Sequence, residues 1–152
     1  MSGWAEFPRM LLDLAVAFAL GFPIGWEREH PAFGPGLRTY PLLALGACAY
    51  TEIGQFAFRD HIDAQARVFQ GLLSGIGFIG AGAIIKRRAE VHGLATAVSI
   101  WVTVSIGVAA SYELFALAAV LSGTTLMALR VLKPLKHHPE KSDKGVERDE
   151  PG

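Results

Sequence analysis

Two acidic side chains stand in stretches of sequence that otherwise carry almost no charge, and these are the first candidates for chemistry. Asp13 lies within MLLDLAVAFALGFPIGW, and Glu52 follows YPLLALGACAYT. Carboxylates bind protons and divalent cations, and Mg²⁺ is often held by one or two carboxylates while it keeps several waters. The pair suggests an acidic site that responds to protons or to a divalent cation, although the sequence names no complete set of metal ligands.

A structural role is the alternative for both acids, and the sequence favours it. Asp13 lies four residues after Arg9, so the two could pair along one face of a helix. Glu52 could pair with Arg59 or Arg67, or could be protonated. Pairs of this kind are common near the ends of helices.

Charged residues also flank a turn rich in proline and glycine, HPAFGPG, at positions 30–36. Two prolines and two glycines prevent a regular helix there, so we expect the chain to fold back on itself. Salt bridges from Glu27 or Glu29 to Arg38 would fix this hairpin, and a docking or ion site is the alternative. The charged hairpin comprises Glu27, Arg28, Glu29, Arg38 and Thr39.

The sequence offers no catalytic constellation. Segment 75–80, GIGFIG, matches a dinucleotide-binding pattern, but that motif needs a preceding strand and an acidic residue farther along. Ser74 has no base within reach, because His61 and His92 are expected at opposite ends of the fold. One cysteine excludes a disulfide framework, and zero net charge disfavours a nucleic-acid partner. We therefore expect no enzymatic activity and no cofactor.

Long runs without charge define the elements that must position these residues. Four such runs occupy positions 39–51, 68–85, 91–112 and 114–129. A transmembrane helix needs about 20 mostly apolar residues, and a soluble domain of 152 residues could not bury so many such runs. The sequence predicts an all-α integral membrane protein, a bundle of about five transmembrane helices at 9–27, 39–58, 67–85, 94–112 and 114–132.

The basic residues indicate how such a bundle is oriented. Five spans place Arg9, Arg59 and Arg67 at one end and the other 11 of the 14 Lys and Arg residues at the opposite end. Because cytoplasmic flanks collect Lys and Arg, we expect the N-terminus outside and the C-terminus in the cytoplasm. Asp13 and Glu52 then lie in the outer half, about 6 and 10 Å from the outer edge at about 1.5 Å per helical residue.

Two boundaries follow from the placement of charges. Residues 1–132 form the predicted transmembrane domain. Residues 133–152 carry five basic and five acidic side chains with few large apolar ones, so we expect a disordered polar tail in the cytoplasm. Only Glu113 separates the fourth and fifth predicted spans, and a single long bent helix is the alternative to a tight hairpin there.

Small residues crowd the third predicted span and suggest close helix packing. Such residues let neighbouring helices approach, and we expect the packing to be internal rather than between subunits. The basic run that follows the span is expected to anchor it to anionic lipid, at about 1 kcal/mol per residue. The packing glycines are Gly71, Gly75, Gly77, Gly80 and Gly82, and the lipid anchor is Lys86, Arg87 and Arg88.

Three sequence blocks carry a family resemblance: GWERE at 25–29 with GLRT at 36–39, GIGFIGAG at 75–82, and GLATAVSIW at 93–101. In order and spacing they resemble the N-terminal membrane domain of the MgtC/SapB family, over about residues 10–130. The resemblance implies a multi-pass protein of the bacterial inner membrane, linked to growth in low magnesium and to survival of pathogens inside host cells. Some members are thought to inhibit the F-type ATP synthase, and many carry the older label of magnesium transporter.

Two departures from the family pattern matter. Longer members carry a C-terminal ACT-like domain where this sequence has only its polar tail, so we expect a short member without that route of regulation. Family members often have Thr or Asn between Gly-Leu and Thr-Ala, where this sequence has Ala95. Any role of that polar side chain in packing is lost or moves to Thr96.

The residues and the resemblance together favour a non-enzymatic protein that helps the cell adapt to low magnesium through intramembrane contacts. The expected partners are the lipid bilayer, other membrane proteins (by resemblance the F-type ATP synthase among them) and further copies of the chain. Mg²⁺ is the one ligand we consider. The alternative is an oligomeric magnesium or proton transporter or channel, oligomeric because five spans are few for a complete transport path.

Overall fold

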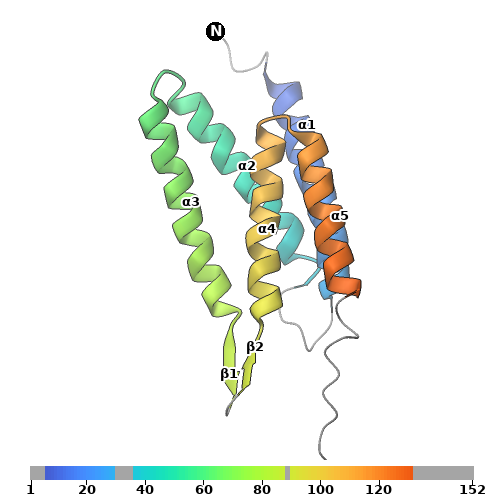
Figure 1. Cartoon of the computed structure of the whole chain (residues 1–152). Coiled ribbons are helices and arrows are strands. Elements are labelled where there is room, and N and C mark those ends of the chain that lie inside the picture. The colour runs from blue at the N-terminus through green and yellow to red at the C-terminus, as the bar shows by residue number, and fades with distance from the viewer. Residues whose placement is uncertain (1–5, 30–35, 88–89, 132–152) are drawn as a thin grey trace, which may run out of the picture.

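The computed structural model shows five helices joined by short connections and one β-hairpin, and it describes residues 6–29, 36–87 and 90–131 (Figure 1). All five predicted spans are therefore helices, and they pack together as one bundle. The predicted tail at 133–152 lies outside the described residues. The helices are α1 (Phe7–Arg28), α2 (Thr39–Ala57), α3 (Ile62–Gly82), α4 (Leu94–Ser111) and α5 (Phe115–Val131).

A tight turn separates α4 from α5, so the alternative of one long bent helix is wrong. Glu113 adopts a positive φ of 57°. Its N–H donates to the carbonyl of Ala110 at 2.9 Å, and the N–H of Leu114 donates to the carbonyl of Ala109 at 2.9 Å. A left-handed residue with hydrogen bonds back to the last turn is a common way to end an α-helix.

A short β-hairpin connects α3 to α4. Strand β1 (Ile85–Arg87) pairs antiparallel with β2 (Glu90–His92), and Lys86 lies opposite Val91. Gly93 follows with a φ of 88°, and a Cβ atom there would lie 1.9 Å from the carbonyl oxygen of Ala83. Glycine alone fits this entry into α4. The all-α expectation holds for the five helices, and the hairpin is an addition that the charge pattern did not indicate.

Consecutive helices run in opposite directions, so their ends gather at two ends of the bundle (Figure 1). We call one of them the acidic end; α1 begins there, and it holds the α2–α3 and α4–α5 turns. The opposite, basic end holds the β-hairpin and the last turns of α1 and α5. The acidic end carries Glu6, Asp13, Glu52, Asp60, Asp63 and Glu113 with Arg9, Arg59 and Arg67. The basic end carries Arg28, Arg38, Lys86, Arg87 and Arg130 among the described residues.

The centre of the bundle is the crossing of α2 and α4, with α1 packed against both. A Cβ atom on Gly107 of α4 would lie 2.1 Å from the carbonyl oxygen of Ala44 on α2. On α1, a Cβ atom on Gly21 would lie 3.0 Å from the carbonyl oxygen of Tyr40. Small residues allow this closeness, which is how helices associate where water does not drive them together. The large side chains buried around the crossing include Ile24, Tyr40, Ile100 and Ile106.

The outward face of the bundle is strongly apolar. Phe78 and Ile62 on α3 are 84% and 82% exposed, and large apolar side chains are exposed on all five helices. Within the described residues, α1 and α4 are each long and apolar enough to cross a membrane, and α5 is a shorter apolar helix. Apolar surface of this extent marks contact with lipid or with another protein.

Candidate functional site

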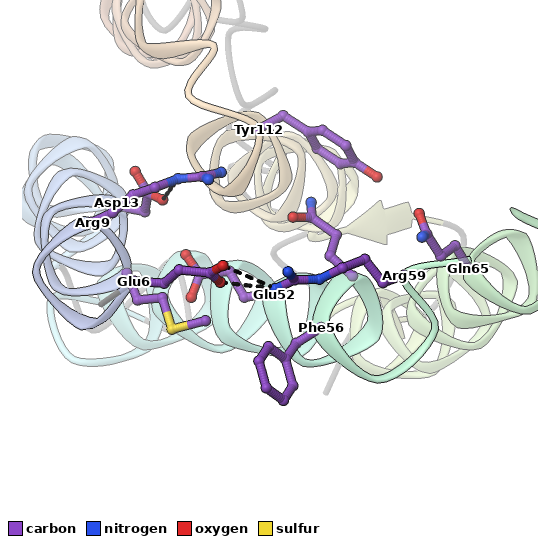
Figure 2. Close-up of a pocket in the computed structure, with 10 residues that line it drawn as sticks. Glu6, Arg9, Asp13, Glu52, Phe56, Arg59, Gln65 and Tyr112 are labelled. Carbon is purple, nitrogen blue, oxygen red and sulfur yellow. Dashed lines mark hydrogen bonds and ion pairs between the residues drawn. The ribbon is translucent and has the colours of Figure 1, made fainter. Parts of the chain in front are cut away.

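A polar cavity of about 360 Å³ opens at the acidic end, between α1, α2 and Tyr112, the residue that directly follows α4 (Figure 2). Its charged lining comes from α1 and the residue before it, from α2 and from the α2–α3 turn. The charged and amide side chains that line it are Glu6, Arg9, Asp13, Glu52, Gln55, Arg59 and Gln65. Both acids that the sequence placed inside the predicted spans therefore face the same cavity.

Asp13 and Glu52 are brought together from different helices and are both buried. Asp13 is 1% exposed and Glu52 is 8% exposed, and the two carboxyl groups lie close enough to interact with each other. The thiol of Cys48, one turn before Glu52, donates to Glu52 Oε1 at 3.9 Å. The close contact of Gly21 with α2 sets α1 and α2 side by side, and this packing makes the two acids neighbours.

The arginines at this end bind other acids as well. Arg59 forms a two-pronged pair with Glu6, with its Nη2 atom 2.9 and 3.1 Å from the two carboxylate oxygens. Arg9 contacts Glu113 directly, and its Nε atom lies 3.8 Å from Asp13 Oδ2. The predicted pairing of Asp13 with Arg9 is thus present, whereas Arg59 pairs with Glu6 rather than with Glu52.

Two neighbouring buried carboxyl groups are chemically able to bind a proton or a cation. Asp13 Oδ1 is buried and has no hydrogen-bond partner among the described residues. The described part of the chain holds no group of three or more His, Cys, Asp and Glu side chains that could hold a metal ion. Two carboxylates can still bind a cation that keeps most of its waters.

The charged hairpin at the basic end is fixed by different partners from those we expected. Glu27 pairs with Arg130 at the end of α5, at 2.9 Å, where the sequence suggested Arg38. The Glu29 carboxylate accepts a hydrogen bond from the backbone N–H of Leu37, so it does close the hairpin, but through the main chain. Arg28 is buried, Arg38 is exposed and Thr39 begins α2. Residues 30–35 lie outside the described residues.

A second buried polar group lies between α2 and α4, and sequence reasoning missed most of it. The hydroxyl oxygens of Tyr40 and Ser99 are 2.7 Å apart, and both side chains are buried. Ser99 lies within 2.8 Å of the carbonyl of Thr96, and the Thr103 hydroxyl donates to the carbonyl of Ser99 at 2.7 Å. The signal was present in the sequence, because Thr96, Ser99 and Thr103 recur at the three- and four-residue spacing of one helix face.

The glycines of α3 differ from one another in what they face. A Cβ atom on Gly71 would lie 3.3 Å from the hydroxyl of Tyr50, and one on Gly80 would lie 3.9 Å from Ala97. A Cβ atom on Gly75, Gly77 or Gly82 would have nothing described within 4 Å outside its own stretch of helix. The expected internal packing is therefore seen at two of the five positions. The strand residues Lys86 and Arg87 lie at the basic end, while their side chains and Arg88 lie outside the description.

The chain is similar to known proteins over most of its length. The MgtC family model matches residues 14–138. Brucella abortus has a relative named "Protein MgtC", 36% identical over 132 residues, which span 87% of this chain and 55% of the relative. "Putative magnesium transporter YhiD" of Escherichia coli is 34% identical over 137 residues, 86% of this chain and 62% of the relative. "Protein SrpB" of Synechococcus elongatus is 33% identical over 135 residues, 81% of this chain and 74% of the relative.

No solved structure matches the chain. The chain spans between about half and two thirds of the length of the MgtC and YhiD relatives. The matched segment covers nearly all of the bundle described above, from the residue after Asp13 to beyond the end of α5. On these grounds the chain belongs to the MgtC family.

Proposed function

We propose that the chain is a multi-pass protein of the bacterial inner membrane, with the acidic end outside and the basic end in the cytoplasm. The apolar outward face of the bundle supports the membrane location. The orientation rests on the concentration of Lys and Arg at the basic end, which is typical of cytoplasmic flanks.

Within the membrane, the protein acts in adaptation to low magnesium by binding another membrane protein through α3. The link to magnesium comes from family membership and from the name of the YhiD relative. The contact role rests on one observation: Ile76 and Gly80 are the buried residues of α3, although α3 is a 21-residue helix. Figure 1 shows α3 at the side of the bundle, where it packs against α2 and α4.

The open face of α3 is suited to a transmembrane helix of a partner. Gly75, Gly77 and Gly82 leave the α3 backbone accessible, and Phe78 stands out between them. A partner helix gains contact where it can approach a backbone closely, whereas lipid chains gain less from such a groove. The F-type ATP synthase is a partner of this kind that the family resemblance suggests.

Site-specific photo-crosslinking in native membranes tests this function. A photoreactive phenylalanine analogue replaces Phe78 on α3 or, as the matched control, Phe18, an exposed aromatic residue on α1. We expect a discrete protein adduct from position 78, stronger in cells grown in low magnesium, and none from position 18. Equal adducts from both positions, or none from position 78, would contradict a docking role for α3.

The buried acids favour one alternative function, an oligomeric transporter or channel for magnesium or protons. Asp13 and Glu52 face a cavity at one end of the bundle, as an entrance for cations would require. Purified protein in proteoliposomes would then move Mg²⁺ or protons, and Glu52→Gln would abolish the flux. Absence of flux, under conditions in which a known transporter works, excludes this alternative and leaves the docking role standing.

A further inference from the structure

We propose that the cavity at the acidic end binds one hydrated divalent cation, with the carboxylates of Asp13 and Glu52 as its two protein ligands. The inference is independent of the docking role of α3, because it concerns side chains of α1 and α2. Binding is measured on the isolated protein, so either idea can fail without the other.

The balance of charge around the cavity is the first argument. Glu6, Asp13, Glu52 and Glu113 meet the guanidinium groups of Arg9 and Arg59 there. Arg59 is held by Glu6, and Arg9 reaches Glu113 as well as Asp13. Four carboxylates thus share two cations. The excess of negative charge lies at the two most deeply buried acids, where water screens it least.

The orientation of Asp13 is the second argument. Its Oδ2 atom lies 3.8 Å from Arg9, but Oδ1 is buried without a hydrogen-bond partner among the described residues. A protonated Glu52 would donate to this atom, whereas an ionised Glu52 can only accept, so Asp13 Oδ1 is left to a proton or to a cation. Buried polar atoms almost always have a partner, so an orphan acceptor that lines a cavity points to a ligand.

The size and lining of the cavity indicate what kind of ion fits. A volume of about 360 Å³ exceeds by several-fold the roughly 30 Å³ that one water molecule occupies, so an ion can enter with most of its hydration shell. The Gln55 amide N–H donates to the carbonyl of Ser111 at 3.4 Å, which leaves its amide oxygen to accept from a metal-bound water. An ion that keeps its waters and takes one or two carboxylates is one like Mg²⁺ or Mn²⁺.

Counting bound Mn²⁺ tests the proposal directly. The full chain is placed in nanodiscs of zwitterionic lipid, and free Mn²⁺ is measured by electron paramagnetic resonance during a titration. We expect one Mn²⁺ per chain, displaced by Mg²⁺ in competition. No saturable binding by the unaltered chain, or binding that Mg²⁺ does not displace, would overturn the proposal.

Charge-neutral variants locate the site. Asp13→Asn and Glu52→Gln should each weaken Mn²⁺ binding at least tenfold. Asp63→Asn is the matched control, because Asp63 is an exposed acid at the same end that does not line the cavity, and it should change the affinity less than twofold. Affinities that fall equally in all three variants would indicate nonspecific attraction to the acidic end and would refute the site.

A variant that should bind Mn²⁺ more tightly distinguishes a true site from loss of binding through misfolding. Arg9→Gln removes the positive charge 3.8 Å from Asp13 and also frees Glu113. A cation at Asp13 would then meet less repulsion, so the affinity for Mn²⁺ should rise severalfold. An unchanged or weaker affinity in a folded Arg9→Gln protein, checked by circular dichroism, would place the ion elsewhere and contradict the proposal.

Discussion

Glycine lies inside a close helix contact at the α2–α4 crossing, whereas on α3 it lies mostly on the open face. α4 buries ten of its 18 residues, and its Gly107 lies directly against the backbone of α2. α3 is richer in glycine, yet three of its glycines face open space. Composition therefore shows that a helix can pack closely, but the side of the helix on which the small residues fall decides whether the contact is internal or left for another molecule.

The largest effect is expected where the backbones are closest. Gly107→Leu places a Cβ atom 2.1 Å from the carbonyl oxygen of Ala44, which α2 and α4 can relieve only by separating. We expect the free energy of unfolding to fall by about 3 kcal/mol or more, because overpacking of a rigid contact is costly. Denaturation in detergent, followed by circular dichroism, measures the change.

Gly46→Leu on α2 is the control for that substitution, because nothing described lies within 4 Å of a Cβ atom there. It should leave stability within about 0.5 kcal/mol of the unaltered protein, as surface substitutions usually do. If Gly107→Leu proved as stable as Gly46→Leu, the α2–α4 crossing would not be the rigid centre of the bundle.

A smaller loss is expected from the polar contact within the same crossing. Tyr40→Phe removes the hydroxyl that lies 2.7 Å from Ser99 Oγ, at a cost of about 1 kcal/mol for one buried hydrogen bond. Tyr50→Phe is the control, because Tyr50 is 45% exposed whereas Tyr40 is fully buried. Equal stability of the two variants would mean that the Tyr40–Ser99 hydrogen bond does not stabilise the α2–α4 crossing.

The helices could be predicted because their cause is chemical and local. Charged groups are costly in an apolar environment, so the charge-free runs and the residues that bound them mark the helices within a few positions. Gly93 and the hairpin before it escaped notice, because the charge-free run continues through Ile84 and Ile85, and the turn into α4 is set by backbone φ rather than by polarity.

Partners across helices could not be predicted, because they depend on the rotation of each helix about its axis. The apolar surroundings of Asp13 and Glu52 identified both as candidate site residues. The sequence did not predict that α1 packs against α2 so as to make them neighbours. Arg59 takes Glu6, a residue just before α1, and Glu27 takes Arg130, more than 100 positions away. Spacing along the chain favoured partners closer in sequence, but the packing of the helices determines which side chains meet.

The pairing at the basic end gives a smaller test. A double-mutant cycle with Glu27→Gln and Arg130→Gln should give a coupling of about 0.5 kcal/mol, as expected for a partly exposed ion pair. The same cycle with Arg38→Gln in place of Arg130→Gln should give a coupling near zero. A larger coupling with Arg38 would support the Glu27–Arg38 salt bridge that the sequence suggested. It would count against the contact between α1 and α5 at this end.

The smallest effect on stability is expected on the open face of α3, and it separates the two regions most directly. A Cβ atom at Gly75 meets nothing described within 4 Å outside its own stretch of helix, so Gly75→Leu should change the free energy of unfolding by no more than about 0.5 kcal/mol. The new side chain would nevertheless fill the groove through which a partner helix approaches, and the adduct from position 78 should be lost. If Gly75→Leu unfolded the bundle, α3 would belong to the rigid core after all. If it left both stability and the adduct unchanged, the glycines of α3 would have no part in docking.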